Sequence, residues 1–267
     1  MSDSWQERFA ADGYAIFEGF IAEDHASRLR TDVDELMVRR VRGEEPMVVS
    51  LPELGPLTSH PPTMELVASL MGGTYAMHHI HASRHDAGRE GVGWHQDYEQ
   101  YPQTNRSHLM VHVFHYLNGL NGEVGDLILL PGSQPLVFGR GEHFVFGTAD
   151  LPGSITMDRL EPGSIVIVHS ALLHGRRPKP GGEARPRYFV DISYCQGGVR
   201  WPGYVGPQRY DEINRLALDR GLDRDGRYAF LYDSDQFFDT TAAAAWLAEN
   251  DRGSLAERFV GGGEADG

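Results

Sequence analysis

GDLILLPGSQ (residues 125–134) is, with PGSIVIVHSALLHG (residues 162–175), the clearest indication of the fold in this sequence. Each stretch joins a short run of apolar and β-branched residues to a Pro-Gly pair, which is the pattern of a buried strand beside a tight turn. HLMVHVFHYL (108–117) and RYFVDISY (187–194) repeat this texture. Several such strands at modest spacing are typical of a sandwich or barrel, so we expect a mainly β protein.

Helical patterns lie on both sides of these strands. Residues 5–37 predict a helix, a short strand and a second helix, residues 39–62 predict mostly loop, and TMELVASLMGG (63–73) predicts a short helix that ends at a glycine pair. After the strands, RYDEINRLALDRG (209–221) and TTAAAAWLAEN (240–250) predict further helices. We therefore expect one domain over residues 1–267: helical support in 1–75, a β core in 76–200, a helical extension in 201–260 and a disordered tail in 261–267.

Composition and charge narrow the function classes. The chain has 38 acidic and 24 basic residues and a formal net charge of −14, which disfavours nucleic acid as a partner. No apolar run approaches the roughly 18 to 20 residues of a membrane span, the opening residues lack the features of a secretory signal, and Cys195 is the only cysteine. These features predict a cytoplasmic protein, while the oligomeric state is not indicated.

The tetrapeptide WHQD places His95 and Asp97 two residues apart. On a strand, residues i and i+2 project from the same face, so the imidazole and the carboxylate point the same way. With a histidine from another strand they form the 2-His-1-carboxylate set that holds Fe(II) and leaves coordination positions open. The tripeptide alone arises easily by chance. The order WHQD, strand with PGS turn, His174-Gly175, then arginine on the next strand is far more specific.

This order resembles the phytanoyl-CoA dioxygenase family, including the ectoine hydroxylases. The resemblance runs from ERFAADGYAIFEGF (7–20) to about residue 197, and its strongest points are WHQD, GDLILLPGSQ, the HG pair, and a PR pair followed seven residues later by tyrosine. It implies a double-stranded β-helix core (a jelly roll, cupin-like) with flanking α-helices. It also implies that His95, Asp97 and His174 bind Fe(II) and that Arg187 grips the distal carboxylate of 2-oxoglutarate, a role suited to a guanidinium fork.

Two further arginines are candidates for binding 2-oxoglutarate. Arg185 is the rival of Arg187, because this chain has about two extra residues between the second histidine and the arginine when compared with the ectoine-type pattern. HASR (81–84) resembles a QSR stretch with which ectoine hydroxylases contact cosubstrate and substrate, so we expect Arg84 to bind the cosubstrate. Ala82 stands where those enzymes have glutamine, and an ectoine-like substrate is therefore not implied.

Three residues are candidates for binding the substrate. Tyr98 and Tyr101 follow the metal motif closely, although aromatic residues beside a barrel mouth are often there for packing. Asp191 shares the strand face of Arg187 by alternation, and a buried acid needs a partner. That partner is either a basic group of the substrate or a nearby arginine such as Arg84 or Arg185.

The expected reaction is hydroxylation of an aliphatic C–H bond of a small molecule, using O₂ and releasing succinate and CO₂ from 2-oxoglutarate. In the resembling family, halogenating members have a small residue in place of the carboxylate, so Asp97 favours hydroxylation. Two alternatives stay open. His78, His79, His81 and His85 form a second cluster, in which His79 and His81 have the spacing of a cupin-like metal pair. A non-catalytic small-molecule binding protein on the same barrel is the other alternative.

Overall fold

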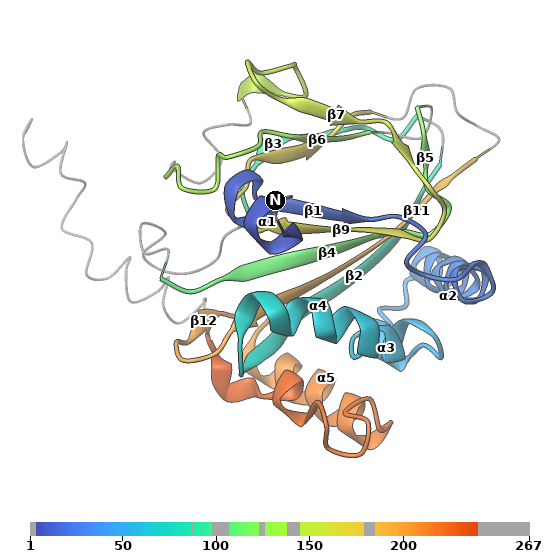
Figure 1. Cartoon of the computed structure of the whole chain (residues 1–267). Helices are drawn as coiled ribbons and strands as arrows, with labels where there is room; N and C mark the ends of the chain where they lie inside the picture. The colour runs from blue at the N-terminus through green and yellow to red at the C-terminus, as the bar shows by residue number, and fades with distance from the viewer. Residues whose placement is uncertain are drawn as a thin grey trace, which may run out of the picture.

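The structure, a computed structural model, describes residues 4–86, 88–97, 107–122, 126–137, 145–178 and 185–239. Two antiparallel sheets face each other, and helices cover the outer side of the larger one (Figure 1). The larger sheet has the order β1 (Tyr14–Phe17), β9 (Ser164–His169), β4 (Met110–Tyr116), β11 (Arg187–Gln196), β2 (Tyr75–His85). The smaller has the order β3 (Val92–His95), β10 (His174–Arg176), β6 (Leu127–Leu129), β7 (Ile155–Met157). This architecture confirms the predicted jelly-roll core.

Two short pairs complete the strands, β5 (Leu120–Asn121) with β8 (Arg159–Leu160) and β12 (Trp201–Pro202) with β13 (Phe237–Phe238). The helices are α1 (Trp5–Asp12), α2 (Glu23–Val41), α3 (Leu54–Leu57), α4 (Pro61–Met71) and α5 (Pro207–Asp219), with 3₁₀ turns η1 (Val48–Ser50), η3 (Ala229–Tyr232) and η4 (Ser234–Gln236). No helix of the described ranges combines the length and apolar character that crossing a bilayer requires.

The helices mostly follow the sequence pattern. A capping box between Ser4 and Glu7 starts α1, and Gly13 ends it in the left-handed conformation at φ 83°. The predicted loop over residues 39–62 is wrong in part, because it contains the end of α2, η1 and α3. Leu54 and Leu57 are fully buried there, so packing against the core orders a segment whose local sequence favours a loop. The expected helix at 240–250 and the tail lie outside the described residues.

Alternation along β9 and β4 divides the core into two layers. Ile165 and Ile167 belong to the cluster packed beneath the helices, whereas Val166 and Val168 face the smaller sheet. A fully buried side chain of this size contributes about 1.5–3 kcal/mol. The larger sheet is therefore held from both sides, and its inner face is a rigid wall for the space between the sheets.

The wall becomes polar along β2 and β11. Their register pairs Arg187 with His85, Asp191 with His81, and Ser193 with His79, so these six side chains share the inner face. The outer face of the same strands carries apolar residues such as Ala82, Val190 and Ile192, which pack under the helices. The polar side chains of β2 and β11 thus lie between the sheets, and the smaller sheet adds His95 and His174 to the same space.

Candidate metal and cosubstrate site

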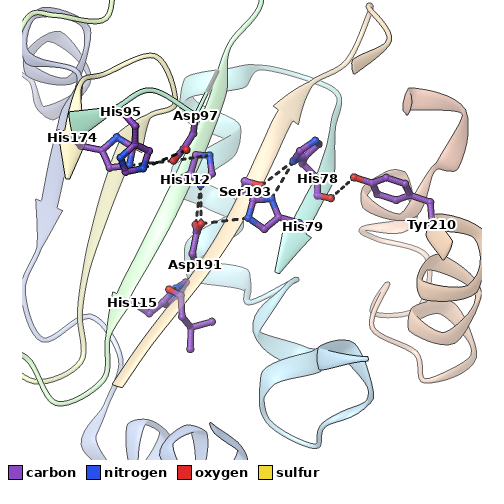
Figure 2. A network of polar contacts seen from close by, with 11 residues as sticks. His78, His79, His95, Asp97, His112, His115, His174, Asp191, Ser193 and Tyr210 are labelled. Atoms are coloured by element: carbon purple, nitrogen blue, oxygen red, sulfur yellow. Dashed lines mark hydrogen bonds and ion pairs between the residues drawn. The ribbon is translucent and has the colours of Figure 1, made fainter. Parts of the chain in front are cut away.

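The structure brings His95, Asp97 and His174 together. Their ligand atoms all lie within 4.8 Å of one another, with 3.6 Å between His95 Nε2 and Asp97 Oδ1 and 3.1 Å between His174 Nε2 and Asp97 Oδ2 (Figure 2). A metal ion about 2.0–2.2 Å from each ligand atom fits between atoms at this spacing. The donor set, two imidazoles and one carboxylate, is the one that suits Fe(II) with open positions.

Strand pairing places the two histidines. β3 and β10 are antiparallel neighbours in which His174 is the direct partner of His95. Trp94 packs away from the site with Ile128 and Leu173, so alternation turns His95 inward. Asp97 follows the end of β3, where its backbone N–H donates to the Ser170 carbonyl at 2.7 Å.

Backbone carbonyls fix the orientation of both imidazole rings. His95 Nδ1 donates to the Gly93 carbonyl at 2.7 Å, and His174 Nδ1 donates to the Leu172 carbonyl at 3.0 Å. Because each Nδ1 donates to a carbonyl, Nε2 is the ring nitrogen that faces Asp97. Hydrogen bonds of this kind commonly hold the ring of a metal-binding histidine in place.

The electrostatics agree with a cation site. Burial, and next the charge of His174, lowers the pKa of His95 to about 4, so its ring is neutral at physiological pH. Burial opposes ionisation of Asp97, but the nearby His174 and His95 outweigh it and hold its pKa well below the usual range. His95 therefore offers a neutral nitrogen ligand, and Asp97 offers an ionised carboxylate.

A cavity of about 240 Å³ extends from these three residues to a buried arginine, Arg187. The Arg187 side chain comes from β11, is 2% exposed, and donates through Nη2 to Tyr116 Oη at 3.3 Å. Its Nε and Nη1 atoms have no hydrogen-bond partner among the described residues. A buried guanidinium with unused N–H groups is suited to charge-assisted hydrogen bonds with a carboxylate. The arginine end of the cavity thus fits the distal carboxylate of 2-oxoglutarate.

Two other residues belong to this end: Arg176, which sequence reasoning missed, and His85, which it named only within the second histidine cluster. Arg176 follows His174 by two residues on β10 and lines the same cavity, and its Nη1 is also without a partner in the described part of the chain. His85 lines the cavity from β2. Burial, followed by the charges of Arg176 and Arg187, lowers the pKa of His85 to about 3. The i+2 spacing after His174 is the signal that could have found Arg176.

The two rival arginines are placed differently. Arg185 is exposed, whereas Arg187 is enclosed in the cavity. Arg84 does not line the cavity, so our expectation that it contacts the cosubstrate is wrong. It lies on the outer face of β2, where it forms ion pairs with Asp34 of α2 at 2.8 Å and with Asp86 at 2.9 Å. Alternation explains this, because the neighbouring His85 points inward.

Of the predicted substrate residues, Asp191 borders the cavity, and Tyr98 and Tyr101 lie outside the described residues. Asp191 pairs with neither Arg84 nor Arg185. Instead it accepts from His112 Nδ1 at 2.9 Å and lies 3.5 Å from His79 Nε2. The expected cupin-like metal pair of His79 and His81 does not form, since the ligand atom of His79 groups with those of His112 and Asp191 instead.

Comparison with protein families identifies one match. The family model described as Phytanoyl-CoA dioxygenase (PhyH) matches residues 9–185, which is more than half of the chain. No curated protein sequence matches the chain. The finer likeness to ectoine hydroxylases stays a prediction.

Solved structures share the fold. AviO1 from Streptomyces viridochromogenes Tue57 is 20% identical, with 73% of this chain and 94% of that chain covered and a TM-score of 0.57. SnoK, a non-heme alpha ketoglutarate dependent carbocyclase from nogalamycin biosynthesis, is 18% identical, with 76% and 88% covered and a TM-score of 0.60. HygX from Streptomyces hygroscopicus, solved with nickel, 2-oxoglutarate and hygromycin B bound, is 14% identical, with 76% and 90% covered and a TM-score of 0.60.

Proposed function

The chain belongs to the phytanoyl-CoA dioxygenase family and is a 2-oxoglutarate-dependent non-haem iron dioxygenase, and from this premise we propose that it hydroxylates an aliphatic C–H bond of a small molecule. One atom of O₂ enters the alcohol product and the other enters succinate, while the carbon of the 2-oxo acid's first carboxylate leaves as CO₂. The observation that carries the proposal is a single cavity in which three metal ligands meet a buried arginine with unused N–H groups.

In this proposal His95, Asp97 and His174 hold the iron and Arg187 orients 2-oxoglutarate. The bound iron and 2-oxoglutarate supply the oxidising power, and the protein supplies ligands, orientation and a sheltered space. Arg187 pairs with the distal carboxylate through N–H groups that no described residue occupies, and Tyr116, already in contact with Nη2, keeps the guanidinium in place. Phe114 and Phe189 line the cavity and exclude water from the region beside the metal ligands.

Asp97 is the reason for proposing hydroxylation. A carboxylate at this position takes a coordination place that a halide would need. Tyr98 and Tyr101 remain proposed substrate contacts because they directly follow this ligand in the sequence. A single catalytic domain over residues 1–267 and a cytoplasmic location likewise remain proposals.

The test is anaerobic binding of Fe(II) and 2-oxoglutarate, followed by aerobic measurement of succinate. We expect one Fe(II) and one 2-oxoglutarate per chain, and slow succinate release that a primary substrate accelerates. His95→Ala and Asp97→Ala should both lose Fe(II), whereas His25→Gln, a histidine of α2 beside Glu53, should keep it. Failure of the wild-type protein to bind the pair would reject the proposal, and metal retained in both ligand variants would favour the cupin-like alternative.

A further inference from the structure

A second cavity, of about 250 Å³, borders Asp97, one of the three proposed metal ligands. It shares Asp97, His81 and Asp191 with the first cavity, so a molecule that occupies it lies next to Asp97 without entering the arginine end. Since 2-oxoglutarate is assigned to the arginine end, the second cavity is the space left for the primary substrate.

The two cavities differ in charge. The described lining of the first includes the arginines Arg89, Arg176 and Arg187, whereas the described lining of the second contains acids and imidazoles and neither arginine nor lysine. A site lined by one sign of charge concentrates ligands of the opposite sign. The arginine end of the first cavity therefore attracts anions, and the second cavity offers an anion no guanidinium or ammonium partner among the described residues.

Asp191 gives the second cavity a fixed negative charge. It is 8% exposed, and among the described residues its ion-pair partners are the imidazoles of His112 and His79 rather than an arginine or lysine. Burial opposes its ionisation, but His112 and then His79 outweigh burial and hold its pKa well below the usual range. Figure 2 shows Asp191 reaching from β11 toward both rings, with His112 between it and Asp97. A carboxylate has about four acceptor sites, so it can also receive a cationic donor.

An aromatic wall stands beside this acid. The Tyr204 ring stacks on the His79 ring at 4.4 Å between centroids and 16° between planes, is 62% exposed, and lines the second cavity. Its backbone N–H donates to Tyr210 Oη at 3.1 Å, and Tyr210 Oη donates to the His78 carbonyl at 2.6 Å, so α5 holds the wall to β2. The face of a tyrosine attracts organic cations.

We propose that the second cavity binds the primary substrate and that this substrate carries a protonated amine, which pairs with Asp191 beside the Tyr204 ring. The inference rests on the proposed function, because the oxidised carbon must lie close to the iron, and the cavity borders its proposed ligand Asp97. It names a substrate class, small organic ammonium compounds, and excludes small carboxylates and phosphates as primary substrates.

A purely structural role for Asp191 makes a different prediction. Asp191 could serve only to position His112 against Asp97, from which His112 Nε2 lies 3.9 Å. Asp191→Asn separates the two roles, because the asparagine carbonyl still accepts the His112 Nδ1 proton while the negative charge is gone. A positioning role alone gives no preference for amines in either protein.

The experiment measures binding of matched probes to the anaerobic complex of the protein with Fe(II) and 2-oxoglutarate by isothermal titration calorimetry. The amines are hexylamine, cyclohexylamine and glucosamine, each compared with its N-acetyl derivative and with heptanoate, cyclohexanecarboxylate or gluconate. We expect at least one amine to bind about tenfold or more tightly than its neutral and anionic counterparts, a difference of about 1.4 kcal/mol. In Asp191→Asn this preference should fall below threefold, about 0.65 kcal/mol.

Asp34→Asn is the matched control, since Asp34 pairs with Arg84 and Tyr188 on the helix side of the sheet and should leave the preference unchanged. The proposal is overturned if no amine binds at millimolar concentration, if the neutral or anionic probes bind equally well, or if Asp191→Asn keeps the preference. Failure of the Fe(II)–2-oxoglutarate complex to form would instead reject the proposed function, and the amine preference would then be measured on the metal-free protein.

Discussion

Arg187→Met is predicted to weaken 2-oxoglutarate binding strongly while leaving the ligand-free protein at least as stable as the wild type. Arg187 is buried at 2% exposure, and its only hydrogen bond to a described residue is the 3.3 Å contact of Nη2 with Tyr116. The rings of Tyr116 and Phe189, 5.1 and 4.8 Å from its Cζ atom, compensate its charge only in part. Burial accordingly lowers the pKa of this guanidinium. An apolar side chain of similar length removes the unpaired charge without opening a large cavity.

The loss of binding can be worked out from the contacts. Losing one partner of a buried, charge-assisted pair costs about 2–5 kcal/mol, and about 3 kcal/mol corresponds to a roughly 150-fold weaker Kd. At a 2-oxoglutarate concentration of about 100 times the wild-type Kd, the ligand stabilises the wild type by about 2.7 kcal/mol but the variant by only about 0.3 kcal/mol. With about 2–4 °C of Tm per kcal/mol, the ligand-induced shift falls from roughly 5–10 °C to about 1 °C.

The assay is calorimetric or fluorimetric thermal unfolding of the metal-loaded protein, kept anaerobic, with and without 2-oxoglutarate. Arg185→Met is the matched control, because Arg185 lies two residues earlier and is exposed. It should keep the full shift. A full shift in Arg187→Met, or a lost shift in Arg185→Met, would refute the assignment of the anchor. A large drop in the Tm of ligand-free Arg187→Met would refute the view that the free protein holds an uncompensated charge.

Three further substitutions test other residues. His174→Ala should weaken Fe(II) binding by more than the roughly 10- to 100-fold loss of affinity that is typical when a hydrogen-bond partner of a metal ligand is removed. Elemental analysis of the purified protein should therefore show less iron, and iron at the wild-type level would contradict the ligand set. Arg176→Met should weaken 2-oxoglutarate binding about tenfold in calorimetric titration, less than Arg187→Met, because a charge-assisted contact of about 1.5 kcal/mol is lost; an unchanged Kd would exclude Arg176 as a contact. His115 of β4 is buried, and burial lowers its pKa to about 4, so the unfolded state gains a proton at this residue below pH 6.5. The contribution of His115 to the free energy of unfolding should be fully present above pH 6.5 and fall by up to about 3 kcal/mol toward pH 4, and His115→Gln should lessen the acid decline by that amount in urea titrations.

The fold and the proposed iron ligands were within reach of the sequence because both depend on local pattern. The strands are short runs bounded by Pro-Gly turns, and the ligands are marked by WHQD and by a histidine at the end of the run 162–175. Asp191 was also placed on the inner face correctly, since alternation from Arg187 requires only that β11 be regular. Local spacing fixes which face a side chain takes once the strand is known.

Residues whose position depends on pairing between strands were harder to predict. His112 lies in a continuous apolar run, a pattern that favours a hydrogen-bonded core histidine. Its neighbours Asp97 and Asp191 are 15 and 79 positions away in the sequence. They meet His112 only through the turn after β3 and the register between β4 and β11. The prediction that Arg84 contacts the cosubstrate was wrong for the opposite reason. It came from a motif resemblance, whereas alternation along β2 puts His85 inward and Arg84 outward.

Several buried polar atoms without partners gather at the arginine end of the site. In the described residues, Arg187, Arg176 and His85 keep buried nitrogen atoms without partners, and each unsatisfied group costs about 1–3 kcal/mol in the free protein. The acid end is different, because Asp191 is held by His112, and His79 is hydrogen-bonded to Ser193 at 2.7 Å. The arginine end is thus arranged for a ligand that completes it, whereas the acid end is already ordered before any ligand arrives. Cosubstrate binding should therefore contribute most of the ligand-dependent stability, and the primary substrate should add selectivity with little further gain in Tm.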